Sequence, residues 1–435
     1  MRAKASILVG LLWCLALLSV VVIGVLHSAR TDLLIVKNHG DRIQARYLAL
    51  AGIEKAKALL YQDARERSRA RANYNGQLHN WPEQFRDVSL GRGRFQVFRR
   101  GRPDEGGGTA YGVSDEESRL NLNVASPDEL GRLIGMTPDL VAALVDWRDE
   151  DNAVSPGGAE ADYYSSLQPP YRPRNGPLQT VRELLMVRGA TPSLLGDDLS
   201  YTGWASILTV DSSVRNVNAA GEDRVNVQTA QENALTSIRG ITPAIAKAIV
   251  SSRGQNRLES VADLLAVVAP QNPQRPEGGP GPIQAAPGQS PQIAPPQNPS
   301  QPVGPKVVSE ELLMDIADDL TTDSTRNLPG VVNINTASLD VLACLPGIDR
   351  EIAQAIISFR QSNGFFPNIA WLLKVPGLNR QIFKQAAPRV TARSETYRIL
   401  SEGKLNSSGT RQRIQAIVHV GLEGVETLSY REDDL

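Results

Sequence analysis

The sequence predicts an α+β fold, in which a long N-terminal helix carries an antiparallel β scaffold that is interrupted by inserted helical modules. Three observations predict this fold. An uncharged run occupies the N-terminus, one set of residues repeats three times in the middle of the chain, and strand-like segments lie on both sides of the repeats. The net charge of −1 and the 21% of charged residues suit one anchor with a large soluble head.

The N-terminal run is long enough to span a membrane. Arg2 and Lys4 precede residues 6–26, which contain no charged side chain. As a helix, this segment measures about 31 Å, the thickness of a bilayer's hydrocarbon core. Basic residues before such a span predict a cytoplasmic N-terminus. No small-residue cleavage box follows, and the first proline is Pro82.

We therefore expect one continuous helix over about residues 6–80. Its second half has apolar residues at spacings of three and four, which predict one buried stripe. These residues are Ala45, Ala49, Ile53, Ala56 and Leu60.

Strand-like segments lie near both ends of the head. Residues 91–101 form a short β run with an aromatic centre, and residues 397–400, 414–420 and 425–431 have the pattern of a half-buried meander. If the early strand pairs with the late ones, the helical modules are insertions in one β scaffold.

The middle of the chain contains three copies of one pattern. In each copy a Gly follows an Asn by 14 residues and an Arg follows the same Asn by 27. The copies are Asn121, Gly135 and Arg148; Asn226, Gly240 and Arg253; and Asn333, Gly347 and Arg360. Each copy predicts two helices joined by a tight turn at the Gly, which is similar to the helix-hairpin-helix motif.

The turns of these modules differ from those that bind DNA. Two residues after the turn Gly, DNA-binding hairpins have a second Gly that lets a phosphate approach. This chain has Thr137, Thr242 and Asp349 there, with few basic residues nearby. Because affinity for a duplex depends mainly on neutralising phosphates, the sequence favours structural or protein-binding modules.

A proline-rich segment separates the second and third modules. Residues 269–306 contain twelve prolines and no aromatic residue. Such a segment buries too little apolar surface to order itself and predicts an extended linker. A proline-rich ligand for a partner groove is the alternative.

The N-terminus resembles that of type IV pilin-like subunits, in which a short basic leader is removed and the apolar core becomes half of a long helix. The resemblance places the cut between Ala5 and Ser6, although Ala5 stands where the family usually has Gly. At the fifth mature position this chain has Gly10 in place of the usual Glu. In this family, lack of that Glu marks the K-type minor pseudopilin of type II secretion.

The head is also similar to the K family. Residues 114–123 (SDEESRLNLN) resemble the segment that enters the family's helical domain. Residues 146–149, 158–160, 162–164, 171–175 and 182–189 follow in the family's order. The likeness covers about residues 1–200 and 330–435, whereas residues 205–305 depart from it. The expected parts are a leader (1–5), helix (6–80), first β part (81–118), first module (119–204), second module (205–268), linker (269–306), third module (307–392) and terminal meander (393–435).

The resemblance implies a minor pseudopilin that caps the tip of the type II secretion pseudopilus and takes part in protein export across the outer membrane. It implies an inner-membrane anchor, a periplasmic head and processing by the prepilin peptidase. The implied partners are the I-type and J-type minor pseudopilins, the major pseudopilin, and a secreted protein or the outer-membrane channel.

Two other classes of function remain open. A membrane-tethered DNA receptor would also combine an anchor with helix-hairpin-helix modules, but the sequence disfavours nucleic acid. A periplasmic hydrolase is the third class. The four histidines are scattered along the chain and no catalytic motif is recognisable, so we expect no enzyme and no required cofactor.

One acidic loop could hold a metal ion. Its carboxylates are hard oxygen donors, which suit Ca²⁺ better than zinc or a transition metal. They belong to Asp146, Asp149, Asp151, Glu160 and Asp162. A solvated acidic loop is the alternative from the residues alone. The resemblance favours calcium, because related subunits bind it in the head.

Overall fold

The computed structural model describes residues 2–70, 80–102, 105–196, 203–269 and 305–432, with side chains from Ile7 onward. The chain divides into two compact units. The first comprises residues 1–63, 77–114 and 397–435, and the second residues 64–76 and 115–396. The first unit is thus built from segments on both sides of the second in the sequence, which confirms that the modules are insertions.

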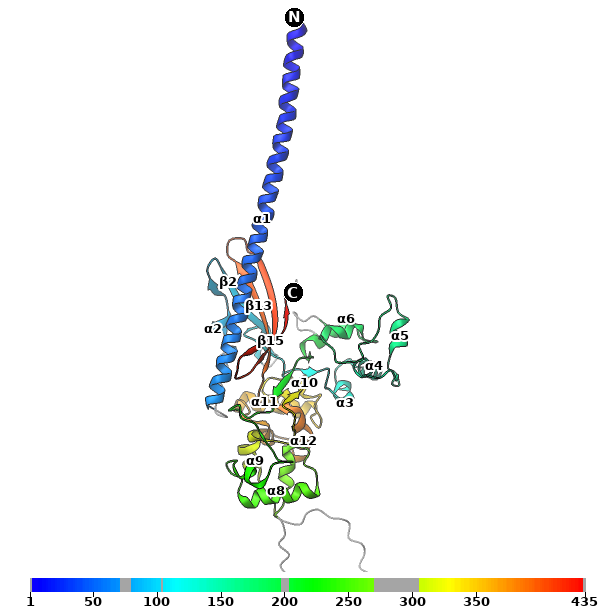
Figure 1. The fold of residues 1–435 in the computed structure, drawn as a ribbon, viewed down its shortest axis with the longest axis vertical. Helices are drawn as coiled ribbons and strands as arrows, with labels where there is room; N and C mark the ends of the chain where they lie inside the picture. Colours follow the sequence, from blue (N-terminus) through cyan, green and yellow to red (C-terminus); the bar gives the residue numbers. More distant parts are fainter. Residues whose placement is uncertain (1, 71–79, 103–104, 197–202, 270–304, 433–435) are drawn as a thin grey trace, which may run out of the picture. The chain divides into compact units, whose positions relative to one another are not determined.

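Helix α1 runs from Arg2 to Ala70 (Figure 1). Residues 7–39 are exposed, and they contain a window with a mean hydropathy of 2.8 that is long enough to cross a membrane. The predicted stripe from Ala45 to Leu60 is buried, with each of its five members at most 2% exposed. The helix is described as far as Ala70, and residues 71–79 of the expected range 6–80 lie outside the described part of the chain.

An antiparallel sheet covers the second half of α1. Its main order is β1-β2-β13-β14-β15, and β3 adds to β2. The early strand β2 pairs with the late strand β13, as the sequence predicted. The elements are α2 (Pro82–Phe85), β1 (Val88–Leu90), β2 (Gly93–Arg100), β3 (Thr109–Tyr111), β13 (Thr396–Leu405), β14 (Arg411–Val420) and β15 (Val425–Arg431). Strand β4 (Ser114–Asp115) lies at the boundary between the units.

The helix touches the sheet through a glycine. A Cβ on Gly403 of β13 would lie 2.1 Å from the carbonyl oxygen of Ala45 and 2.5 Å from the amide nitrogen of Ala49. Leu48, Phe95 and Ala45 form a small apolar core beside this contact. The absent side chain therefore allows the backbone of α1 to rest directly on the strand.

The second unit contains three modules of similar construction. Here η denotes a 3-10 helix. The first module has β5 (Leu120–Asn121), α3 (Pro127–Gly131), α4 (Pro138–Arg148), α5 (Ala161–Ser165), η4 (Val181–Met186), α6 (Pro192–Leu195), η5 (Gly203–Ser206) and β6 (Leu208–Thr209). The second has β8 (Val225–Asn226), α7 (Glu232–Thr236), α8 (Pro243–Gln255), η6 (Val261–Ala266), α9 (Glu310–Ile316), η7 (Ala317–Asp319) and β9 (Leu320–Thr321). The third has β11 (Val332–Asn333), α10 (Leu339–Leu342), α11 (Arg350–Asn363), η8 (Ile369–Lys374), α12 (Arg380–Ala386), η9 (Ala387–Arg389) and β12 (Val390–Thr391).

Each module is closed by its own first and last strands. The pairs β5–β6, β8–β9 and β11–β12 are all parallel and two residues long. A further antiparallel pair, β7 (Ser213–Arg215) with β10 (Asn327–Pro329), joins the segments that flank the second module. One continuous apolar core runs through all three modules.

The repeated Asn and Arg have a common structural task. The Asn side chain accepts a hydrogen bond from the amide two residues later, at 2.8–2.9 Å in all three copies. The Arg guanidinium donates to the carbonyls one and four residues after that Asn. In the third module these bonds run from Arg360 to Ile334 and Ala337. The spacing of 27 residues thus reflects an Arg that fastens the second helix to the start of its module.

The modules differ in where extra residues are inserted. In each module, the side chain two residues after the repeated Asn accepts a hydrogen bond from a backbone amide later in the chain. This amide belongs to Leu178 in the first module, Leu258 in the second and Phe366 in the third. The two residues are 55, 30 and 31 positions apart, respectively. The first module therefore has 55 − 30 = 25 extra residues before this point, and the acidic loop lies among them. In the second module, Val268 bridges to Lys306, so the proline-rich segment takes the place of the second hairpin turn. Residues 270–304 of that segment lie outside the described chain.

Candidate metal centre

The insertion in the first module begins where α4 ends. Trp147, near the end of α4, packs edge-on against Tyr164 at 5.1 Å and donates a hydrogen bond from its indole nitrogen to Glu183 at 3.0 Å. Arg188 donates to the carbonyl oxygen of Gly158 at 2.8 Å. These contacts fold the loop back onto the end of the helix.

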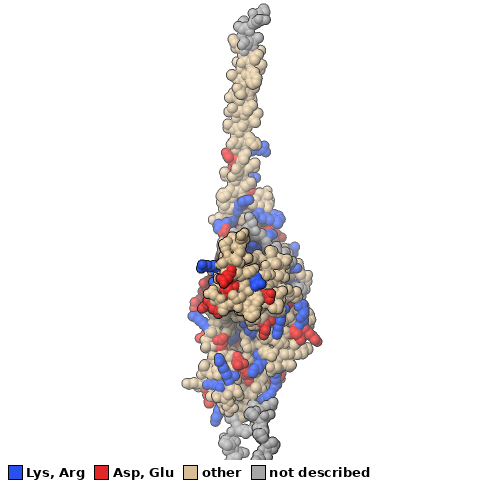
Figure 2. All heavy atoms as spheres, turned by 90° about the vertical axis from the view of Figure 1, so that its right-hand side faces the viewer, with Lys and Arg blue, Asp and Glu red and all other residues tan. Residues whose placement is uncertain are grey.

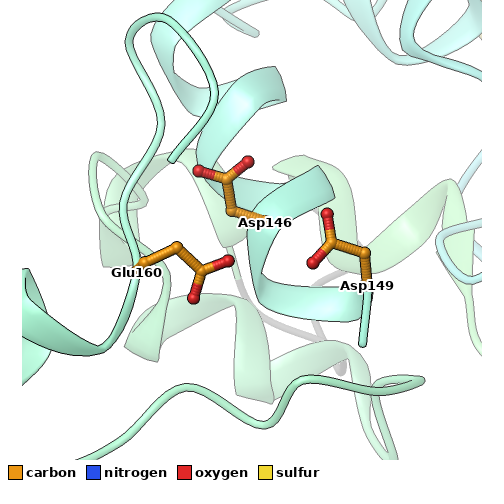
Figure 3. Close-up of side chains that lie close together, drawn as sticks. All are labelled: Asp146, Asp149 and Glu160. Carbon is orange, nitrogen blue, oxygen red and sulfur yellow. The ribbon is translucent and has the colours of Figure 1, made fainter. Parts of the chain in front are cut away.

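Three carboxylates meet at this point. Asp146 and Asp149 come from the end of α4, and Glu160 precedes α5 (Figure 3). One oxygen from each lies within 4.8 Å of the others, and Figure 3 shows the three side chains close together. Asp146 is fully buried and Glu160 is 3% exposed. The arrangement places two buried carboxyl groups and one half-buried carboxyl group close together.

Two of the three carboxyl groups have buried oxygens without a hydrogen-bond partner. Both carboxylate oxygens of Glu160 and one of Asp149 are buried without a hydrogen-bond partner. Burial and the neighbouring carboxylates raise the pKa values of Asp149 and Glu160. Buried charges without partners are costly, so the site is one that a cation would stabilise. The donor set fits a hard divalent ion such as Ca²⁺.

The other two predicted ligands lie outside this group of three. Asp151 accepts a hydrogen bond from the amide of Ala153 at 2.7 Å, and Asp162 is exposed in the first turn of α5. Asp151 still contributes to the raised pKa values of Asp149 and Glu160.

Sequence reasoning overlooked two residues that shape the site. Ser155 donates its amide to Asp146, and a Cβ on Gly158 would lie 2.0 Å from the Oδ2 atom of Asp146. The signal was the Gly157-Gly158 pair just before Glu160, which lets the loop approach the carboxylate.

The predicted hairpin glycines do lie at turns. Gly135, Gly240 and Gly347 have φ values of +85°, +100° and +75°, which only glycine adopts easily. A Cβ on each would meet the second hairpin's helix in the same module, at 2.5–2.9 Å from Leu194, Leu312 or Gln385.

In each module, the N-terminus of the helix that follows the turn is capped by a side chain. Thr137, Thr242 and Asp349 each accept a hydrogen bond from the backbone amide three residues later. DNA-binding hairpins present free backbone amides to a phosphate at these positions. In this chain, a side chain there already accepts a hydrogen bond from one of these amides. On the face that Figure 2 shows, basic and acidic residues are intermingled rather than segregated.

The predicted processing residues Ala5 and Ser6 precede the described side chains. The backbone there is helical and continuous with the rest of α1.

The fold defines the class of this protein. An apolar helix of membrane-spanning length that continues onto an antiparallel sheet, with modules inserted between early and late strands, is a pilin-like architecture. Residues 114–197 match the family model described as "Type II secretion system (T2SS), protein K", and residues 221–269 and 330–391 match that of the helix-hairpin-helix motif. This part of the chain is therefore similar to protein K of type II secretion systems.

Curated relatives and one solved structure are similar over longer parts of the chain. The type II secretion system protein K of Pectobacterium carotovorum subsp. carotovorum is 27% identical over 274 residues, which are 58% of this chain and 76% of that protein. The protein K of Klebsiella pneumoniae is 28% identical over 204 residues, 42% of this chain and 56% of that protein. A solved structure of the GspK-GspI-GspJ complex from enterotoxigenic Escherichia coli aligns with a TM-score of 0.43 at 12% identity, over 92% of this chain and 99% of that one.

A further curated relative matches over a shorter length. The ComE operon protein 1 of Bacillus subtilis is 36% identical over 63 residues, 14% of this chain and 31% of that protein.

Proposed function

We propose that this protein is a minor pseudopilin that caps the tip of the type II secretion pseudopilus. The observation that carries this proposal is the match of residues 114–197 to protein K, in a chain whose first helix has a membrane-length apolar segment. The apolar half of α1 anchors the protein in the inner membrane, with the N-terminus in the cytoplasm and the head in the periplasm. Its role is assembly and not catalysis.

Assembly requires partners for the exposed face of α1. Residues 7–39 are exposed in the structure, although they contain a strongly apolar window. In a membrane such a surface packs against lipid or against other helices. The partners are the I-type and J-type minor pseudopilins, and the large head at the end of the helix suits a terminal position better than one within a stacked shaft.

Co-purification tests this role. When the tagged full-length chain is expressed with its I-type and J-type neighbours and extracted in mild detergent, we expect both to be recovered with it. The recovered chain should begin at Ser6 after cleavage by the prepilin peptidase. If both neighbours reach the membrane fraction and neither is recovered, the chain does not cap a pseudopilus through them.

We also propose that Asp146, Asp149 and Glu160 bind Ca²⁺. The support is the buried, unpartnered oxygens of Glu160 and Asp149 in a site built only from oxygen donors. When bound, the ion would supply positive charge that compensates the three carboxylates. It would thereby hold the inserted loop against the end of α4.

A calcium titration tests this site. At a free calcium concentration of about 100 Kd we expect roughly 2.7 kcal/mol of stabilisation of the natural chain over the calcium-free protein. Glu160→Gln should lose most of this gain, whereas the control Glu150→Gln, an exposed residue of the same loop, should keep it. Equal gains in both variants, measured by thermal unfolding and calorimetry, would show that calcium binds elsewhere.

The DNA-receptor alternative has weaker support. It rests on the helix-hairpin-helix match, but the turn positions that would hold a phosphate are occupied by capping side chains, one of them the acidic Asp349. The repeated Arg residues donate to carbonyls inside their own modules and are not directed to a ligand.

A further inference from the structure

A polar pocket of about 140 Å³ lies on the sheet of the first unit. It is formed by the loop after α2 and by strands β2, β13 and β14. Because Gly403 rests on α1 and side chains alternate along a strand, Glu402 and Lys404 point to the opposite face of the sheet. The pocket therefore opens on the face that α1 does not cover, and it has room for several waters or one small anion.

The strand register brings two cations together in this pocket. Lys404 on β13 lies directly opposite Arg94 on β2, and Glu402 lies opposite Gln96. Like charges that face each other across an antiparallel pair destabilise it unless an opposite charge compensates them. The pairing of Lys404 with Arg94 is therefore stable only if negative charge lies nearby.

The acidic residues nearby compensate only part of this positive charge. Asp87 pairs with Arg94 at 3.3 Å, and Glu402 accepts hydrogen bonds from Arg413 at 2.8 Å and Gln96 at 3.1 Å. Arg411 approaches Glu402 only to 3.7 Å.

Lys404 is half-buried, and its side chain has no hydrogen-bond or ion-pair partner among the described residues. Four cationic side chains therefore lie near two carboxylates. The cations are Arg94, Lys404, Arg411 and Arg413, and the carboxylates are Asp87 and Glu402. The uncompensated positive charge is on Lys404 and Arg411.

We propose that this pocket binds one oxyanion group, a carboxylate or a phosphate, between Lys404, Arg411 and Arg94. A guanidinium offers paired N–H donors that match either group, and the ammonium of Lys404 supplies a compact charge beside it. The size of the pocket restricts the ligand to a single such group, free or at the end of a larger molecule. This site is separate from the acidic loop and does not depend on the assembly role.

Matched charge-removing variants of the full-length protein in detergent test the site. The probes are inorganic phosphate and acetate, each titrated by calorimetry at constant ionic strength set with chloride. We expect Lys404→Gln to weaken binding of the preferred probe by about tenfold or more, the loss of one direct charge-assisted contact. Arg92→Gln is the control, because Arg92 is exposed and lies outside the pocket. This substitution also removes one positive charge.

A stability comparison keeps the test independent of folding defects. In chloride alone, Lys404→Gln should unfold at the same temperature as the natural chain or at a higher one, since it relieves repulsion with Arg94. With the probe in excess, the natural chain should become the more stable of the two. Preference for phosphate would identify a phosphorylated ligand and preference for acetate an acidic side chain. Absence of binding by both probes, or equal binding by Lys404→Gln and Arg92→Gln, would overturn the proposal.

Discussion

Replacing Glu117 with alanine is expected to destabilise the second unit by roughly 2–5 kcal/mol, because it leaves two buried amides without an acceptor. Glu117 is fully buried, and its carboxylate accepts hydrogen bonds from the amides of Ser213 at 3.2 Å and Thr396 at 3.1 Å. Its carbonyl oxygen accepts from the amide of Asn333 at 2.8 Å. One residue thus ties together segments that are far apart in the sequence.

The charge state of Glu117 gives this prediction a pH dependence. Burial, and then the neighbouring Asp115, raise the pKa of Glu117 well above its usual value of 4.5. A carboxyl group with a raised pKa in the folded state contributes stability that is fully present below pH 4.5 and is lost as the pH rises through the raised pKa. Glu117→Gln, which resembles the neutral acid, should therefore lower the free energy of unfolding by less than Glu117→Ala does. Its stability relative to the natural chain should increase as the pH rises.

Denaturant unfolding of the full-length protein at several pH values measures both effects. Glu423→Ala is a suitable control, because Glu423 is exposed in the turn between β14 and β15 and should change stability by less than about 0.5 kcal/mol. A Glu117→Ala variant as stable as this control would contradict the role of Glu117 at the module junction.

Gly403→Ala is expected to cost about 3 kcal/mol in the first unit, at the upper end of what overpacking a core usually costs. The added Cβ would meet backbone atoms of Ala45 and Ala49, at 2.1 and 2.5 Å. A side chain can rotate away from such a contact, but the backbone of a helix can yield only if α1 moves off β13. The substitution should therefore loosen the attachment of the helix to its sheet.

Hydrogen exchange of the amides around Ala45 and Ala49, together with thermal unfolding, measures this effect. We expect faster exchange there and a lower unfolding temperature. Gly40→Ala is the matched control in the same helix, because nothing lies within 4 Å of its Cβ and alanine favours a helix by about 1 kcal/mol over glycine. If the two substitutions behaved alike, α1 would not rest on β13 as described.

Local patterns in the sequence were sufficient to predict the main elements. The uncharged run from residue 6 to 26 predicted the anchor, and the spacing of Ala45, Ala49 and Ile53 predicted the face of α1 that is buried. The alternating runs predicted β2 and β14, and the recurrence of Asn, Gly and Arg predicted three similar modules. Such patterns are readable because a helix or strand repeats its exposure over a few neighbouring residues.

The tertiary structure decided what the individual residues do. Arg148, Arg253 and Arg360 could have been ligand-binding cations, and only the fold shows that they donate to carbonyls 23 and 26 residues earlier. Of the five acidic residues of the loop, it brought three together. Lys404 and Arg94 face each other only because β13 pairs with β2 in one register. The sequence by itself determined which elements form, because neighbouring residues impose them; hydrogen-bond partners and charge clusters depend on contacts between residues far apart in the chain, which no local pattern encodes.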